Sequence, residues 1–446
     1  MYRIGIGLNR KVKFVLKLFN FSYIFNHKLF KNTFIYAGFN VINQAIPFFL
    51  LPIMTRYLTP ADYGITATFS VLLAVMTVFV GLSMHGAIGV NFFKLNKNEL
   101  KEYIGNVFSI LFSNFLLVFI IVYILKSYFS FFTKFPENWI PFMVIIALCE
   151  SIYSINIGLW QVEQKSLPYG LFQISRTILN VSLSVVFVVL LYWGWQGRLL
   201  GIIITSIIFG LLSIFVIYKR EYIKFSFNKK YIKDALFFGV PLIPHALSGW
   251  IITGIDRIFI NSMVGVAATG LYSVGYQVGM IIGLLAHSFN LAWSPFLFEK
   301  LKENNYSTKE KIVKFTYLYD VGIIFLALAL SFIAPYFLNF FVSENFYFSY
   351  KYVLWIALAN AFGGMYFMVV NYIFYVKKAY ILAWVTFSSA GINIVLNYFF
   401  IKANGAIGAA QATTITFFVQ FIMVWILSAK VYRMPWVDFS NFKKYF

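Results

Sequence analysis

Charged residues that could do chemistry in this sequence stand inside long apolar stretches. Asp256 and Arg257 are adjacent in the run GWIITGIDRIFI, which is otherwise almost free of charge. A charge in the hydrocarbon core of a membrane is costly, so such residues pair with each other or mark the path of an ion or substrate. Both interpretations stay open here. The other charged residues in apolar runs are Glu150, Arg176 and Asp320.

The composition decides what surrounds these charges. The chain has 446 residues, of which 61% are hydrophobic and 11% are charged, whereas water-soluble domains average about 25% charged residues. We therefore expect an all-α polytopic membrane protein. The single cysteine, Cys149, excludes a disulfide within the chain, and no Cys/His cluster has metal-ligand spacing. The sequence shows no catalytic constellation, and it lacks the P-loop needed for ATP hydrolysis. We therefore expect no metal, no cofactor and no enzymatic activity, with coupling to H⁺ or Na⁺ left open.

Segments of about 20 mainly apolar residues are long enough to cross a membrane. The sequence holds twelve of them, at 33–55, 63–91, 103–125, 139–160, 169–192, 198–218, 233–255, 268–292, 313–340, 352–376, 380–401 and 406–429. The formal net charge is +21, and most of the 36 lysines and arginines fall in alternate connections. Lysine and arginine are enriched in cytoplasmic loops, so this bias predicts that both termini are cytoplasmic. The positive charge is therefore explained by membrane topology and does not indicate a nucleic-acid partner.

Two halves of the sequence resemble each other. In the segments 34–71 and 236–278, a glycine is followed by prolines and then, at the same spacing, by Arg56 or Arg257. Such repeats predict two six-helix lobes related by a pseudo-twofold axis along the membrane normal, with a substrate path between them. The predicted divisions are a basic leader (1–32), an N-lobe (33–218), a linker (219–232), a C-lobe (233–430) and a tail (431–446).

Polar residues recur at helical spacing along several spans. They indicate either hydrogen bonds between helices or the wall of a hydrophilic cavity. The cavity candidates are Asn180, Gln277, Asn360 and Asn393.

Three arginines point to an anionic substrate, because the planar guanidinium binds phosphate oxygens bidentately. Arg56 and Arg257 are expected at the outer ends of equivalent helices, where basic residues are disfavoured. We expect Arg176 to line the central cavity and Arg257 its outer mouth, with Asp256 orienting the guanidinium. A structural pair between Glu150 and Arg176 is the alternative.

The stretches YLTPADYGITATFSVL (57–72) and GVPLIPHALSGWIITGIDRIFINSMVGVAATGLYSVGYQV (239–278) resemble the Wzx-type O-antigen and polysaccharide flippases. These belong to the MATE-like multidrug/oligosaccharidyl-lipid/polysaccharide exporter superfamily. The resemblance implies flipping of an undecaprenyl-pyrophosphate-linked oligosaccharide across the bacterial inner membrane by alternating access. It also implies contact with membrane lipids, a polysaccharide polymerase and a chain-length regulator.

Two other functions remain in view. A cation-coupled multidrug antiporter of the same superfamily would use Glu150, Asp256 or Asp320 to bind the coupling ion. A polymerase or ligase for lipid-linked sugars is less favoured, because such enzymes usually carry a large outer loop and the predicted outer connections are short.

Overall fold

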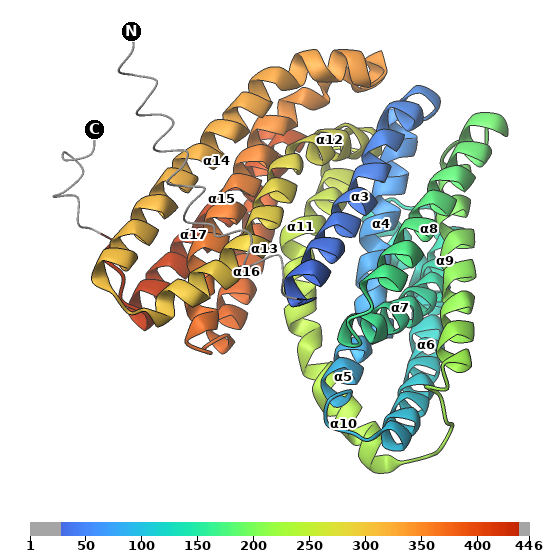
Figure 1. Ribbon diagram of the computed structural model, residues 1–446. Helices are drawn as coiled ribbons and strands as arrows, with labels where there is room; N and C mark the ends of the chain where they lie inside the picture. The colour runs from blue at the N-terminus through green and yellow to red at the C-terminus, as the bar shows by residue number, and fades with distance from the viewer. Residues whose placement is uncertain (1–27, 437–446) are drawn as a thin grey trace, which may run out of the picture.

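The computed structural model describes residues 28–436 (Figure 1). Within this range the secondary structure is helical, and twelve segments are long and apolar enough to cross a membrane. The twelve predicted spans and the all-α fold are thereby confirmed. Residues 1–27 of the predicted basic leader and residues 437–446 of the predicted tail lie outside the described range.

The helices gather in two bundles (Figure 1). The first bundle contains α3 (Lys28–Tyr57), α4 (Pro60–Gly81), α5 (Met84–Asn91), α6 (Lys97–Thr133), α7 (Ile140–Val162), α8 (Ser166–Val185) with the π-helical turn η2 (Val186–Leu190), and α9 (Gly194–Lys219). The second contains α12 (Val266–Gly279), α13 (Ile281–Lys302), α14 (Tyr306–Phe341), α15 (Tyr350–Tyr375), α16 (Tyr380–Asn404) and α17 (Ala406–Val431). Short 3₁₀ turns, η1 (Glu137–Trp139) and η4 (Glu344–Ser349), precede α7 and α15.

A broken helix passes between the bundles. Its first part, α10 (Lys229–Gly239), packs against α5 and α6, and its second part, α11 (Ile243–Met263), packs against α4, α12 and α16. The break is the 3₁₀ turn η3 (Val240–Leu242), which contains Pro241, and Pro244 follows in the first turn of α11. Proline fits the first turn of a helix but breaks an interior, which explains why one apolar run folds as two segments.

Local sequence signals fix where helices start. Thr59 caps α4 in a capping box with Asp62, directly before Pro60 at the first helical position. Asn96 and Glu99 form a second capping box at the start of α6. These boxes satisfy backbone N–H groups that have no partner inside the helix.

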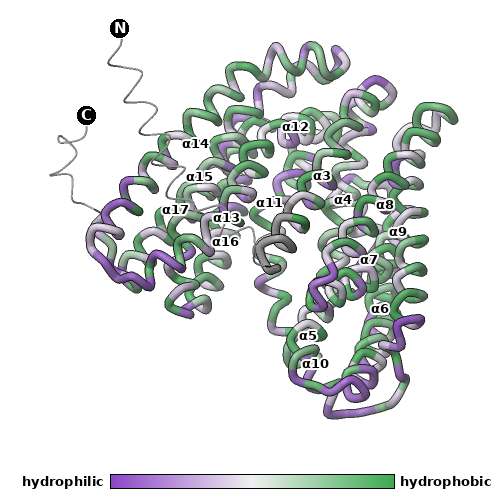
Figure 2. Tube along the Cα trace, in the orientation of Figure 1, coloured by the Kyte–Doolittle hydropathy of each residue, from purple (hydrophilic) through white to green (hydrophobic). Residues whose placement is uncertain are grey.

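The two ends of the molecule differ in charge. The connections at 92–96, 163–165, 220–228, 303–305 and 376–379 form what we call the basic end, and those at 58–59, 134–136, 191–193, 264–265, 342–343 and 405 form the opposite end. Figure 2 shows hydrophobic residues along most of each helix and hydrophilic residues gathered at the basic end.

Side-chain hydrogen bonds join the bundles in the half of the molecule nearer the opposite end. Among the described residues they connect α3 and α4 with α12 and with the segment before η4. The bonds are Gln277 Nε2 to Tyr63 OH at 2.7 Å and Ser343 Oγ to the Thr55 carbonyl at 2.6 Å. From the broken helix, Asn261 Nδ2 donates to Thr68 Oγ1 at 2.6 Å.

Glycines bring the backbones of α4 and α12 into direct contact at the opposite end. A Cβ on Gly64 would lie 2.0 Å from the Val266 carbonyl oxygen, and one on Gly270 would lie 1.9 Å from the Pro60 carbonyl oxygen. No other residue type fits such distances. The bundles are therefore closed against each other at this end.

Candidate functional site

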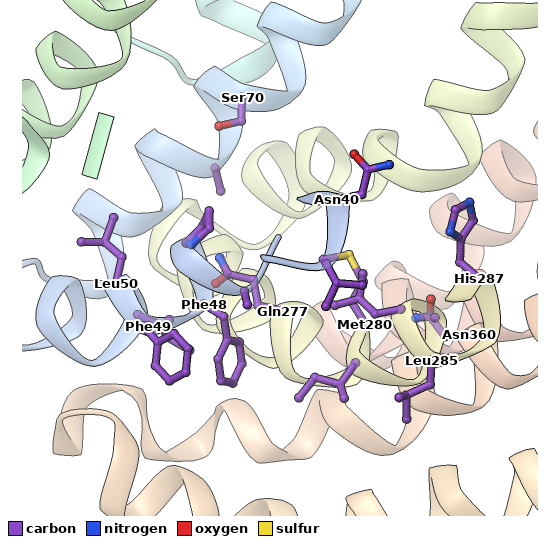
Figure 3. Close-up of a pocket in the computed structure, with 18 of the residues that line it drawn as sticks. Asn40, Phe48, Phe49, Leu50, Ser70, Gln277, Met280, Leu285, His287 and Asn360 are labelled. Atoms are coloured by element: carbon purple, nitrogen blue, oxygen red, sulfur yellow. The ribbon is translucent and has the colours of Figure 1, made fainter. Parts of the chain in front are cut away.

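A cavity of about 970 Å³ lies between the bundles. Its walls come from α3, α4 and α9 on one side and from α12, α13, α15 and α17 on the other. Figure 3 labels lining residues from α3, α4, α12, α13 and α15. Apolar side chains form most of the wall. The polar groups that interrupt it are Asn40, Tyr63, Thr66, Ser70, Arg198, Gln277, His287, Ser288 and Asn360.

Arg198 is the one lysine or arginine among the residues that line this cavity. It lies near the start of α9, toward the opposite end. Its Nη1 donates to Asn180 Oδ1 at 2.8 Å and to Ser184 Oγ, both on α8. No Asp or Glu of the described chain lies within 4.0 Å of the guanidinium nitrogens. The cavity wall thus carries a cation held by neutral groups.

Two glycines allow Arg198 to reach α8. A Cβ on Gly197 would lie 3.0 Å from the Phe187 backbone, and one on Gly201 would lie 2.7 Å from Ser184 Oγ. Small residues four apart let two helices approach closely in a membrane. The spacing GRLLG therefore packs α9 onto α8 and η2 and positions the arginine between the two close contacts.

Two of the predicted cavity residues lie in the wall. Gln277 donates to Tyr63 across the two bundles, and Asn360 donates to the Ile356 carbonyl of its own helix at 2.8 Å. The Asn360 side chain also packs tightly on Gly283, whose added Cβ would lie 2.2 Å from Asn360 Oδ1. Both amides present polar atoms beside largely apolar surface.

Arg176 and Glu150 form an ion pair inside the first bundle. The guanidinium donates to Glu150 Oε1, and it lies over the Tyr153 ring at 4.3 Å from the ring centroid. Ser206 Oγ donates to the same carboxylate oxygen at 2.8 Å. Neither charged residue is among those lining the cavity, so of the two interpretations the structural pair describes this conformation.

Asp256 and Arg257 form the corresponding pair beside the second bundle. Asp256 is 1% exposed; it accepts from Arg257 Nη1 at 3.0 Å and from the Tyr272 hydroxyl. The guanidinium also donates to the Thr253 carbonyl and lies 4.3 Å from the Tyr276 ring centroid. Asp256 thus contacts the guanidinium directly, but Arg257 does not line the cavity in this closed arrangement of the opposite end.

The remaining predicted residues are dispersed. Arg56 is exposed in the last turn of α3. Asn180 supports Arg198 from behind the wall. Asn393 is fully buried between α16 and α17, where it donates to Thr416 Oγ1 at 3.2 Å. Asp320 lies in α14, where its Oδ1 is buried and accepts no hydrogen bond from the described residues.

Comparisons of the sequence find related proteins. Residues 29–301 match the family described as polysaccharide biosynthesis protein. An uncharacterized membrane protein of Haemophilus influenzae is 28% identical over 356 residues, which cover 78% of this chain and 85% of that protein. The capsular polysaccharide biosynthesis protein CapF of Staphylococcus aureus is 25% identical over 280 residues, covering 62% of this chain and 67% of CapF.

Two solved structures share the fold. The inward closed conformation of the lipid II flippase MurJ superposes with a TM-score of 0.69 at 18% identity, over 90% of this chain and 86% of MurJ. An inward-facing multidrug resistance MATE family transporter of the MOP superfamily superposes with a TM-score of 0.68 at 14% identity, over 90% of this chain and 96% of that transporter.

Proposed function

Because the chain belongs to the family of polysaccharide biosynthesis proteins, whose members are membrane transporters rather than enzymes, we propose that it flips a lipid-linked oligosaccharide between the leaflets of a bacterial inner membrane. The proposed anchor is undecaprenyl pyrophosphate, and the proposed sugar is the repeat unit of an O-antigen or of a capsular or exopolysaccharide. The observation that carries the proposal is the unpaired guanidinium of Arg198 in an otherwise largely apolar cavity.

Arg198 suits a pyrophosphate group. The hydrogen bonds that hold it use Nη1, so the other guanidinium N–H groups remain available to phosphate oxygens. A guanidinium binds such oxygens with a planar fork, and it does so strongly where water is scarce. The amides of Gln277 and Asn360 and the hydroxyl of Ser70 offer further hydrogen bonds to a sugar headgroup.

Apolar residues beside the cavity suit the prenyl chain. Phe49 on α3 and Leu285 on α13 line the cavity, yet 66% and 53% of their surface is exposed. These exposed apolar side chains give a prenyl chain a surface to pack on beside the cavity. The headgroup would occupy the cavity while the chain stays among lipid tails, since burial of each CH₂ in hydrocarbon contributes about 0.8 kcal/mol.

The charge bias supports an orientation. We propose that the basic end and both termini are cytoplasmic. The cavity, closed at the opposite end, then represents a state that receives substrate from the cytoplasmic leaflet. After reorientation the product would be released to the outer leaflet, where a polysaccharide polymerase and its chain-length regulator are the proposed recipients.

Asp320 supports coupling to an ion. A lone carboxylate in a membrane is costly unless it binds a proton or a metal cation, and no Lys or Arg nitrogen of the described chain lies within 4.0 Å of it. The other two proposed coupling residues, Glu150 and Asp256, already bind arginines. We therefore propose Asp320 as the coupling site for H⁺ or Na⁺.

A multidrug antiporter receives less support from the cavity. A site for cationic drugs should present carboxylates, and the lining residues include neither Asp nor Glu. A polymerase or ligase function also receives less support. Such enzymes usually carry a large outer loop, whereas the connections at the opposite end are short within the described range.

The test is reconstitution of the full chain in liposomes with an undecaprenyl-pyrophosphate oligosaccharide that carries a fluorophore on the sugar. Bleaching by external dithionite reports how fast the headgroup crosses. We expect Arg198→Gln to slow crossing about 10- to 100-fold, the range for loss of a hydrogen bond to a charged group. Arg56→Gln, which removes an exposed arginine outside the cavity, is the matched control. Wild-type rates for Arg198→Gln would refute the proposed site, and uptake of a cationic dye in place of the lipid would favour the antiporter.

A further inference from the structure

A second hollow lies on the surface of the broken helix, away from the cavity. It measures about 560 Å³ and runs along α10 onto η3. Lys229 and Lys233 stand at its beginning, and Phe237, Val240 and Pro241 form its far part. From residue 229 to residue 241 a helix rises about 18 Å. This length is similar to one leaflet of a membrane, because half of the hydrocarbon core is about 15 Å thick.

The other face of α10 is fixed to the first bundle. Asp234 accepts hydrogen bonds from Tyr103 OH at 3.0 Å and from Asn91 Nδ2 at 2.9 Å. Behind the hollow, Gly239 packs so closely that a Cβ would lie 2.1 Å from the Leu82 carbonyl oxygen. The helix therefore cannot rotate to bury the hollow without losing these contacts.

The lysines of the hollow are not used by the fold. Within the described chain, no carboxylate lies within 4.0 Å of the ammonium group of Lys229 or Lys233. Spaced four apart on α10, the two ammonium groups lie on one face of the helix. Next to them Phe237 is 80% exposed, so cationic and apolar surfaces adjoin on this face of α10.

We propose that this hollow binds an anionic phospholipid. The headgroup phosphate lies between Lys229 and Lys233, and one acyl chain lies along Phe237, Val240 and Pro241. Charge complementarity selects this occupant, because basic residues at the membrane surface attract anionic headgroups and the apolar part accepts a lipid tail. A soluble anion would leave the apolar part empty, and a zwitterionic lipid would not match the charge.

The position of the hollow gives the lipid a conformational role. It runs from α10 onto η3, so an occupant contacts both the first segment of the broken helix and the turn that joins it to α11. A ligand that fits one arrangement of two segments stabilises that arrangement relative to others. The bound lipid therefore favours the conformation described here, in which the cavity is closed at the opposite end.

Binding is tested by native mass spectrometry of the purified full chain titrated with phosphatidylglycerol or phosphatidylcholine. We expect selective binding of phosphatidylglycerol, and we expect the double variant Lys229→Gln/Lys233→Gln to lower that affinity roughly 25-fold, about fivefold for each lysine. Lys377→Gln/Lys378→Gln makes the same charge change at another part of the basic end and should leave the affinity unchanged. Equal binding of both lipids, or unchanged affinity in the first double variant, would overturn the proposal.

The conformational role has its own measurement. The native cysteine is first removed by Cys149→Ser. Lys94 and Lys302, which are exposed at the basic end of the first and second bundle, are then replaced by cysteine. The two new cysteines are labelled with a donor and an acceptor for fluorescence energy transfer. Phosphatidylglycerol vesicles should lengthen the mean separation relative to phosphatidylcholine vesicles, and the Lys229→Gln/Lys233→Gln change should abolish the difference. Binding without any change in separation would disprove the conformational role and leave the binding site. Neither measurement depends on the transported substrate.

Discussion

The two sides of the molecule treat their intramembrane charges in parallel ways, with one difference. The first bundle neutralises Glu150 with Arg176, and the second side neutralises Asp256 with Arg257. What remains in the first bundle is a cation, Arg198, held by neutral groups in the cavity wall. The second bundle keeps an anion, Asp320, whose Oδ1 accepts no hydrogen bond from the described residues.

This difference suggests a division of tasks between the bundles. Paired charges are weak evidence for function, since each partner satisfies the other. Charges without a counter-ion are costly in a membrane and more informative about transported species. Under the proposed function, the first bundle would bind the anionic headgroup and the second would bind the coupling cation.

The largest effect is expected when a buried pair is broken. Asp256→Ala leaves Arg257 without its counter-ion and Tyr272 without its acceptor, so we expect a loss of about 3–5 kcal/mol in unfolding free energy. Denaturation of the purified protein in detergent measures it. Glu150→Ala should cost less, because the side chain of Arg176 is 25% exposed and that of Arg257 is 11% exposed. Equal losses would remove the distinction between the two pairs.

The next effect concerns the unpaired anion. Asp320→Asn keeps the shape of the side chain but removes its charge, so flipping driven by an imposed H⁺ or Na⁺ gradient should fall at least about tenfold. Exchange without a gradient should persist, because the cavity is unchanged. Liposomes with each gradient imposed separately identify the ion. Gradient-driven flipping at the wild-type rate would contradict the assignment.

A smaller effect tests the unpaired cation. Arg198→Lys keeps the charge but loses the planar fork, so crossing should slow by about three- to tenfold, less than in Arg198→Gln. The bleaching assay compares the two variants directly. If lysine and glutamine slow crossing equally, the shape of the fork matters rather than the charge.

The smallest effect is expected when a pair is replaced as a whole. The double variant Glu150→Met/Arg176→Met removes both charges, and we expect the unfolding free energy to change by about 1 kcal/mol or less. Flipping should continue, because neither residue lines the cavity. A large loss of flipping with normal stability would return Arg176 to the substrate path.

Hydropathy alone was sufficient to predict the spans, because a membrane requires long apolar helices whatever their tertiary contacts. It could not predict the role of Arg198. The sixth predicted span starts at residue 198, whereas α9 begins at Gly194, so this arginine stands at the edge of the predicted span and is not among the predicted cavity residues. The local signal was the GRLLG spacing, which acquires meaning only once Asn180 and Ser184 are known to face it. The adjacent pair Asp256–Arg257 was visible in the sequence, but its burial against Tyr272 depends on tertiary packing.

The backbone contact between α4 and α12 has a consequence for the energy supply of the cell. A passage wide enough for a sugar pyrophosphate would dissipate the electrochemical gradient if a file of water molecules crossed it. Between α4 and α12, Gly64 and Gly270 leave less than the space of a methyl group, so no water passes between the two backbones there. Closure of this kind is steric and all-or-none. For the proposed cargo, it would allow entry from one side while the bilayer stays impermeable to ions.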